Sequence, residues 1–201
     1  MTLQEMLDAL VVETRMEVYR AQLLRRLQEA IRGLHSAALF SRDKRSAITD
    51  TSGLTSQKFS LPFPENCTKL AVIRPVASEG GPLTLTTHND CYTPIEDESL
   101  LNGIDGSPLI DYYHAKDTAV YIYSSIIPPK IFMSWYQLPD TTDMSLQTWL
   151  MERHPQAIMD WALARFWRVN GKENIASQIE RTLYSVDIPN IINTYATEEE
   201  L

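Results

Sequence analysis

Apolar side chains recur at helical spacing most densely between Pro155 and Val169, where ten of the fifteen residues are apolar and not proline. Wound at 3.6 residues per turn, the polar members fall close to one narrow stripe: Gln156, Asp160, Arg165 and Arg168. Pro155 suits a first helical position because its missing N–H would be unsatisfied there, and Gly171 suits the position just past a C-terminus. The pattern predicts a helix that is buried on most sides, in the fold or against another copy.

The N-terminal forty residues show helical spacing twice. Thr2 and Glu5 have the spacing of a capping box, and a first apolar series accompanies them: Leu3, Met6, Leu7, Leu10 and Val11. A second series runs from Tyr19 to Ala38, with Arg20, Arg25, Arg26 and Arg32 between its members. The pattern predicts helical structure over residues 2–38. It leaves open whether this is one continuous helix or two helices separated near residues 12–15. The arginines fit a solvated face or a contact with an acidic neighbour.

The last third of the chain is predicted to be helical as well. A short helix is expected over Met144 to Arg153, with Asp143 as a possible N-cap. After Gly171, one narrow apolar stripe predicts a final helix that ends before Pro189; the stripe is Ile175, Ile179, Leu183 and Val186. The residues beyond Pro189 are expected to form a tail that buries itself poorly and docks elsewhere.

Between Phe40 and Pro139 the pattern changes, because this stretch holds nine of the eleven prolines and five of the seven glycines. Short β-type runs are expected at 58–61, 70–76, 83–87, 118–124 and 130–137, the last two as an antiparallel hairpin. The predicted fold class is α+β, mainly helical: a small helical bundle with an inserted antiparallel β region. Residues 1–45 and 141–196 would form the bundle, 46–140 the β-rich insertion and 187–201 a docking tail.

Composition narrows the function classes. The formal net charge of −8 argues against a surface that grips nucleic acid, since affinity for phosphate comes from Lys and Arg. No apolar run is long enough to span a bilayer, and the N-terminus does not have the pattern of a signal peptide, so we expect a cytosolic setting with Cys67 and Cys91 as reduced, structural thiols. Residues 75–115 hold seven acidic residues and no Lys or Arg, which fits a solvated loop or an acidic surface facing DNA.

Motifs of catalysis and ligand binding do not occur in the chain. It contains no G-x-G-x-x-G, Walker, G-x-S-x-G or H-E-x-x-H sequence. The histidines are scattered, and His88 to Cys91 offers too few ligands for a stable metal site. The sequence singles out no pair among its 26 acidic residues for acid–base catalysis. We therefore expect no catalytic residues, no metal and no cofactor.

Residues 130–188 combine a strand reading F-M-S-W-Y, an acidic linker, T-W-L near His154-Pro155, an alanine-rich helix and an amphipathic helix. The N-terminal region contains T-L-Q-E-M-L-D-A-L and R-R-L-Q-E-A-I-R-G-L. These stretches and the order of elements resemble the head-to-tail adaptor (connector, or head-completion) proteins of tailed bacteriophages, most specifically over residues 130–188. The insertion of about a hundred residues is long for a small adaptor.

The resemblance implies a virion protein, assembled in the host cytoplasm, that forms a ring of about twelve copies beneath the portal and also meets a tail or nozzle protein. DNA would pass through without specific binding, and no membrane would be involved. Candidate portal-binding residues lie near the C-terminus: Leu183, Tyr184, Val186, Ile188, Pro189, Ile191, Ile192 and Tyr195. From their charge, candidate channel-lining residues are Glu96, Asp97, Glu98 and Asp105. Two alternatives stay open, a virion-associated peptidoglycan hydrolase and a non-viral cytosolic helical scaffold.

Overall fold

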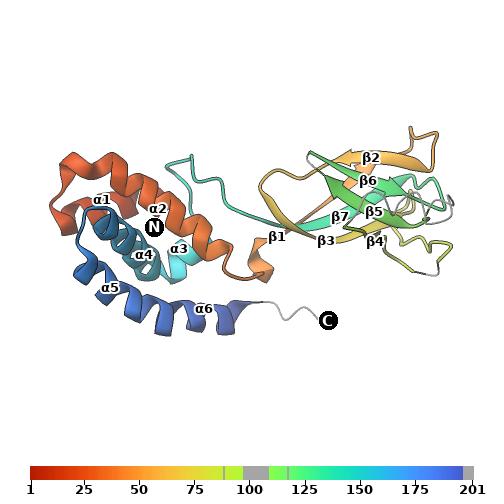
Figure 1. Cartoon of the computed structure of the whole chain (residues 1–201). Coiled ribbons are helices and arrows are strands. Elements are labelled where there is room, and N and C mark those ends of the chain that lie inside the picture. The colour runs from red at the N-terminus through yellow and green to blue at the C-terminus, as the bar shows by residue number, and fades with distance from the viewer. Residues whose placement is uncertain (88, 97–108, 117, 197–201) are drawn as a thin grey trace. The chain divides into compact units, whose positions relative to one another are not determined.

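The computed structural model describes residues 1–87, 89–96, 109–116 and 118–196, and it divides the chain into two compact units (Figure 1). The helical unit comprises Met1–Asp43 and Leu138–Leu201, and the β unit comprises Lys44–Gln137. The insertion predicted at 46–140 and the β unit differ by no more than three residues at either end. The chain therefore enters the β unit at Lys44, where one strand begins, and leaves it after Gln137, where another strand ends.

The prediction of a mainly helical chain is wrong. The fold is α+β with 42% helix and 25% strand, and the strands form two sheets of three and four strands. Three strands were not predicted from the sequence pattern, one of them the two-residue β4 (Thr93–Pro94). β1 (Lys44–Asp50) is exposed along nearly all its length and so lacks apolar alternation, and β5 (Tyr112–Lys116) lies in the acidic region expected to be partly loop.

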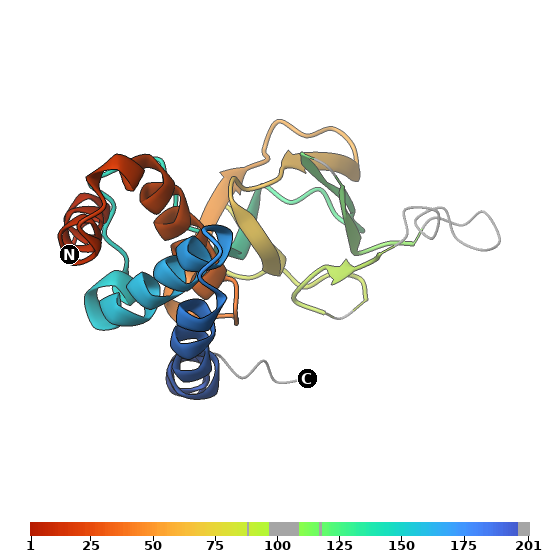
Figure 2. The same cartoon turned by 60° about the vertical axis from the view of Figure 1, so that its left-hand side comes forward.

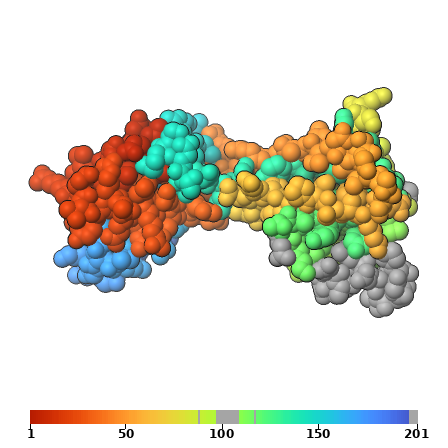
Figure 3. All heavy atoms as spheres, turned by 90° about the horizontal axis from the view of Figure 1, so that it is seen from above, coloured from red at the N-terminus to blue at the C-terminus, as the bar shows by residue number. Residues whose placement is uncertain are grey.

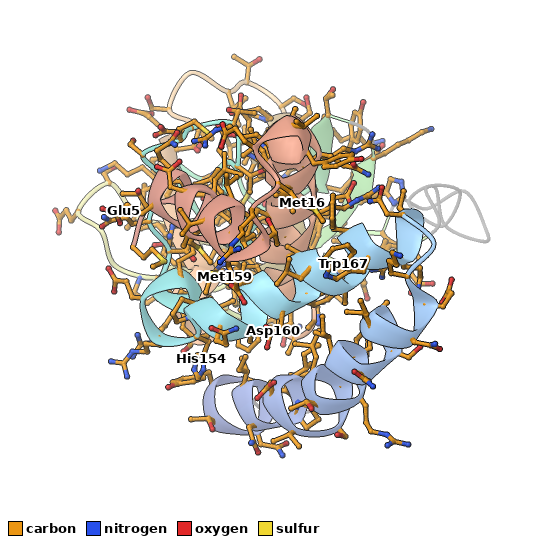
Figure 4. The ribbon with its side chains drawn as sticks, turned by 90° about the vertical axis from the view of Figure 1, so that its left-hand side faces the viewer. Glu5, Met16, His154, Met159, Asp160 and Trp167 are labelled. Atoms are coloured by element: carbon orange, nitrogen blue, oxygen red, sulfur yellow. The ribbon has the colours of Figure 1, made fainter. Side chains whose placement is uncertain are left out.

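In the helical unit, the central prediction is confirmed, because α4 spans Pro155–Val169 with proline in its first turn and Gly171 follows at a φ of 73°. Seven of its residues are buried, and it lies between α2 (Arg20–His35) and α5 (Glu173–Thr182) (Figure 4). This helix is the centre of one apolar core. The core also includes the buried faces of α1 (Leu3–Thr14), α2 and α3 (Trp149–Arg153).

The N-terminal helices are two, separated at Arg15, whose φ of 54° ends α1. A 3-10 turn, η1 (Glu17–Tyr19), leads into α2. The capping box is confirmed: the Thr2 N–H donates to Glu5 Oε2 at 2.8 Å and the Glu5 N–H donates to Thr2 Oγ1 at 3.1 Å. In Figure 3, α1 and α2 form most of the visible face of this unit, with the segment after Leu138 along one side and α5 along the other.

The C-terminal helix does not end before Pro189, contrary to the prediction. A π-helical turn, η4 (Leu183–Asp187), joins α5 directly to α6 (Ile188–Tyr195), and proline occupies the first turn of α6. Proline lacks an N–H and crowds the preceding carbonyl groups, and a wider turn accommodates both effects. Residues 173–195 are therefore one helical run, here called the C-terminal helical segment. The other expected cap is also corrected, because Thr148, not Asp143, caps α3.

The β unit contains two sheets that share one apolar core. Their orders are β1-β7-β3 and β2-β6-β5-β4, and the remaining strands are β2 (Lys58–Pro62), β3 (Cys67–Val76), β4 (Thr93–Pro94), β6 (Ala119–Tyr123) and β7 (Lys130–Gln137). The core draws Ile73 and Met133 from the first sheet and Val120 and Ile122 from the second, so the sheets face each other (Figure 2).

The predicted hairpin of residues 118–124 with 130–137 is wrong. β6 pairs with β2 and β5, whereas β7 pairs with β1 and β3 in the other sheet. The Pro128-Pro129 pair between them connects two sheets, and the Thr51 N–H donates to the Pro129 carbonyl at 2.8 Å. The run at 83–87 is not a strand either; its Leu85 N–H donates to the Asn89 carbonyl and its side chain is buried in the core.

Candidate partner-binding site on the C-terminal helical segment

The eight candidate portal-binding residues divide between the two faces of the C-terminal helical segment. Leu183, Ile188 and Ile191 are at most 9% exposed and belong to the core of the helical unit. Pro189, Ile192 and Tyr195 are half-buried. Tyr184 and Val186 are exposed, at 46% and 47%. The expectation of a tail that cannot bury itself is therefore wrong, because this segment packs one face onto its own unit.

Aromatic contacts hold the end of the segment in place. The Tyr195 ring lies edge-on to Trp149 at 5.0 Å and to His154 at 5.5 Å between centroids. The guanidinium of Arg42 lies over both the Trp149 and Tyr195 rings, 5.5 and 5.7 Å from their centroids. A backbone bridge then pairs Ala196 with Phe40. These contacts tie α6 to the residues that precede the first crossing into the β unit.

A buried polar network fixes the surface on which α6 packs. Asp43 is 6% exposed; its Oδ2 lies 2.7 Å from His35 Nδ1, and its Oδ1 accepts from Trp149 Nε1 at 2.9 Å. The other nitrogen of His35 lies 3.1 Å from the Thr148 hydroxyl, which also accepts the Met151 N–H as the cap of α3. A carboxylate only accepts, so the Nδ1–H of His35 donates to Asp43, and Nε2 shares a hydrogen bond with the Thr148 hydroxyl. Every member of the network is then satisfied.

A hollow lies between the start of α4 and the segment, lined by Arg153, His154, Pro155, Gln156, Ala157, Asp187, Asn190, Ile191, Thr194 and Tyr195. Burial, followed by the charge of Arg153, lowers the pKa of His154, while Asp187 opposes this shift. Nearby on α4 (Figure 4), burial raises the pKa of Asp160 in spite of the hydrogen bond from Gln156, and the charge of Asp187 raises it further. Both shifts disfavour the charged forms, as expected where water is partly excluded.

The candidate channel-lining residues are largely beyond what the structure describes. Glu96 is exposed and follows Ile95, whose N–H donates to the Tyr113 carbonyl at 2.8 Å. Asp97, Glu98 and Asp105 lie outside the described residues. Their assignment to a channel stays a prediction.

The two cysteines are free thiols, separate from each other in the β unit. Burial raises the pKa of Cys67 to about 11 and also raises the pKa of Cys91. Such thiols react slowly because the thiolate is the nucleophilic form. Within the described ranges, no group of three or more His, Cys, Asp or Glu side chains is placed to hold a metal ion.

Comparison with known proteins gives no match to any protein family or to any curated protein. Among the helices that the structure describes, none is long and apolar enough to cross a membrane. The sequence did not reveal the network of His35, Asp43 and Trp149, because Asp43 and Trp149 are 106 residues apart and the three residues carry no motif. The sequence also did not reveal that the side chains of Leu183, Ile188 and Ile191 are buried in the core of the helical unit.

Proposed function

We propose that this protein is a head-to-tail adaptor of a tailed bacteriophage, which forms a ring of about twelve copies beneath the portal, joins capsid to tail and surrounds the DNA channel. The proposal starts from the sequence resemblance over residues 130–188. The observation that carries it in the structure is the two-sided character of the C-terminal helical segment. Some of its apolar side chains are fixed in the core of the helical unit, and others are exposed to solvent.

Three apolar side chains of the segment stay exposed and available to a partner: Ile175, Tyr184 and Val186, between 42% and 47% exposed. Tyr184 also contacts the Trp161 ring, 6.0 Å away between centroids, so it is held in position before any partner arrives. Fully burying an aliphatic or aromatic side chain contributes about 1.5–3 kcal/mol. Burying the exposed half of each of these three side chains against a partner would contribute roughly 1 kcal/mol of binding free energy per side chain.

A second group of exposed apolar side chains lies on other elements of the helical unit. Val12 is 76% exposed and Val18 is 94% exposed, beside the break between α1 and α2, and Val169 at the end of α4 is 60% exposed. A ring closed by head-to-tail contacts requires two different surfaces on each copy. These two groups supply two apolar surfaces of different composition, in keeping with the proposed ring.

The portal contact can be tested with single charge substitutions that leave the core intact. Val186→Glu places a carboxylate at an exposed position of the segment, and Ile127→Glu is the matched control, because Ile127 is 46% exposed in the β unit. Both variants should melt like the wild type. In co-sedimentation with the cognate portal, the wild type and Ile127→Glu should bind, and Val186→Glu should bind at least tenfold more weakly. Equal binding by all three would contradict the assignment of this segment to the portal.

The alternatives have their own tests. A peptidoglycan hydrolase would clear a suspension of purified cell walls, which an adaptor would leave turbid. A non-viral helical scaffold would stay monomeric and would not bind the portal.

A further inference from the structure

The outer face of the three-stranded sheet carries a hollow with a strongly basic lining. Its residues come from all three strands and alternate along them, as expected for one face of a sheet: Lys44, Ser46, Val72, Arg74, Phe132 and Ser134, with Arg45 at the edge. The lining side chains include three cations and no carboxylate among the described residues. This is unusual in a chain whose formal net charge is −8.

The hollow contains polar groups that lack partners. Ser134 is only 3% exposed, yet within the described part of the chain its hydroxyl has no hydrogen-bond partner. Arg74 Nε is also buried without an acceptor there, while the guanidinium lies over the Phe132 ring at 4.7 Å. Leaving a buried polar group unsatisfied costs about 1–3 kcal/mol, so such groups point to an absent acceptor.

The strand register places these groups on a diagonal across the sheet. Lys44 lies opposite Tyr136 and Arg74 lies opposite Phe132, on the two strands that flank β7. Ser134 is midway between Phe132 and Tyr136 on β7 itself. With about 3.3 Å per residue and about 4.8 Å between strands, the Cα atoms of the two cations are roughly 16 Å apart, with the serine at the centre.

We propose that this hollow binds the sugar–phosphate backbone of a nucleic-acid strand. Arg74 Nε can only donate and the Ser134 hydroxyl can also donate, so a ligand with acceptor atoms and negative charge satisfies both. A row of residues whose Cα atoms span about 16 Å suits successive phosphates better than one carboxylate. The guanidinium of Arg74, stacked on Phe132, offers a flat cationic surface on which an exposed base can stack.

Because the rest of the chain is acidic, we expect the affinity for nucleic acid to be low and to fall as the salt concentration rises. Each phosphate contact with a single strand contributes about −0.7 to the slope of log K against log salt. Contacts from Lys44 and Arg74 therefore predict a slope of about −1.4. The proposal goes beyond the adaptor function and does not depend on it, because it concerns the isolated chain.

Fluorescence anisotropy with a labelled oligothymidylate, measured between about 50 and 200 mM salt, tests the proposal on the full-length protein. Lys44→Gln and Arg74→Gln should each weaken binding roughly threefold at low salt and reduce the slope by about 0.7. Ser134→Ala should weaken binding without changing the slope, because a neutral hydroxyl releases no counterion. Lys58→Gln is the matched control: it removes the same charge from β2, in the other sheet, and should change neither quantity.

Three results would overturn the proposal. The first is no binding by the wild type at about 50 mM salt. The second is an equal loss with Lys58→Gln, which would show only the effect of net charge. The third is tighter binding of a glutamate-rich peptide than of the oligonucleotide, which would make this a protein-docking site. Thermal melts must show that each variant is folded, and Ser134→Ala is expected to be at least as stable as the wild type because it removes an unsatisfied hydroxyl.

Discussion

Deleting residues 187–201 should destabilise the helical unit as well as removing a candidate contact surface. The deletion takes away α6, whose Ile188 and Ile191 are 9% and 2% exposed in the core. It also removes Tyr195, which contacts the Trp149 ring at 5.0 Å. The packing of α6 shows that this segment belongs to the folded unit.

The cost of the deletion can be worked out from these residues. Burying an isoleucine contributes about 1.5–3 kcal/mol, so the two together contribute about 3–6 kcal/mol. An edge-to-face aromatic pair adds about 0.5–1.5 kcal/mol. A loss of about 4–7 kcal/mol is comparable with the whole stability of many domains, which is about 5–15 kcal/mol. At about 2–4 °C per kcal/mol, Tm should fall by roughly 10–25 °C.

Differential scanning calorimetry of the full chain and the deletion variant measures this change directly. Val186→Glu serves as the comparison, because an exposed substitution is expected to change stability by no more than about 0.5 kcal/mol. If the deletion variant melts within about 2 °C of the full chain, the packing of α6 on the helical unit is refuted. If it melts as predicted, loss of portal binding by the deletion would reflect unfolding, and the point variants are the informative test.

Three further predictions concern single residues. Asp43→Ala leaves the N–H groups of His35 and Trp149 without their acceptor and should lower the free energy of unfolding by about 2–5 kcal/mol in urea titrations; a change below about 0.5 kcal/mol would contradict the network. Asp160→Asn should raise Tm at pH 7, because the raised pKa of Asp160 makes its ionised form unfavourable in the folded state; the gain should vanish as pH falls towards the ordinary value of 3.8, and a gain independent of pH would refute this cause. With a pKa of about 11, Cys67 should be about one part in a thousand thiolate at pH 8, so in a Cys91→Ser variant it should react with a disulfide reagent rapidly only after denaturation.

The parts of the fold that the sequence predicts well are specified by neighbouring residues. α4 begins at Pro155 and ends before Gly171 because both signals are local, and Thr2 and Glu5 likewise cap α1 without help from the rest of the chain. The apolar stripe predicted for the last helix holds only in part, because Leu183 and Ile179 pack in or against the core whereas Ile175 and Val186 are exposed. The continuation of the helix past Pro189 could not be predicted, because a π-helical turn has no sequence signature that separates it from a helix end.

Features that depend on distant contacts could not be predicted. β6 and β7 both read as strands, but nothing in their residues specifies that they join different sheets. The hollow on the outer face of the β1-β7-β3 sheet depends on β1, which has no apolar alternation and was not recognised. The net charge of the whole chain argues against nucleic-acid contact. That sum does not show the local group of cations on one face of a sheet.

Native mass spectrometry of the protein with the portal from the same genome tests the proposed function most directly. The adaptor account predicts a complex in which the protein and the portal subunit are present in equal copy number, near twelve of each. A protein that stays separate from the portal at concentrations where both are folded would contradict it.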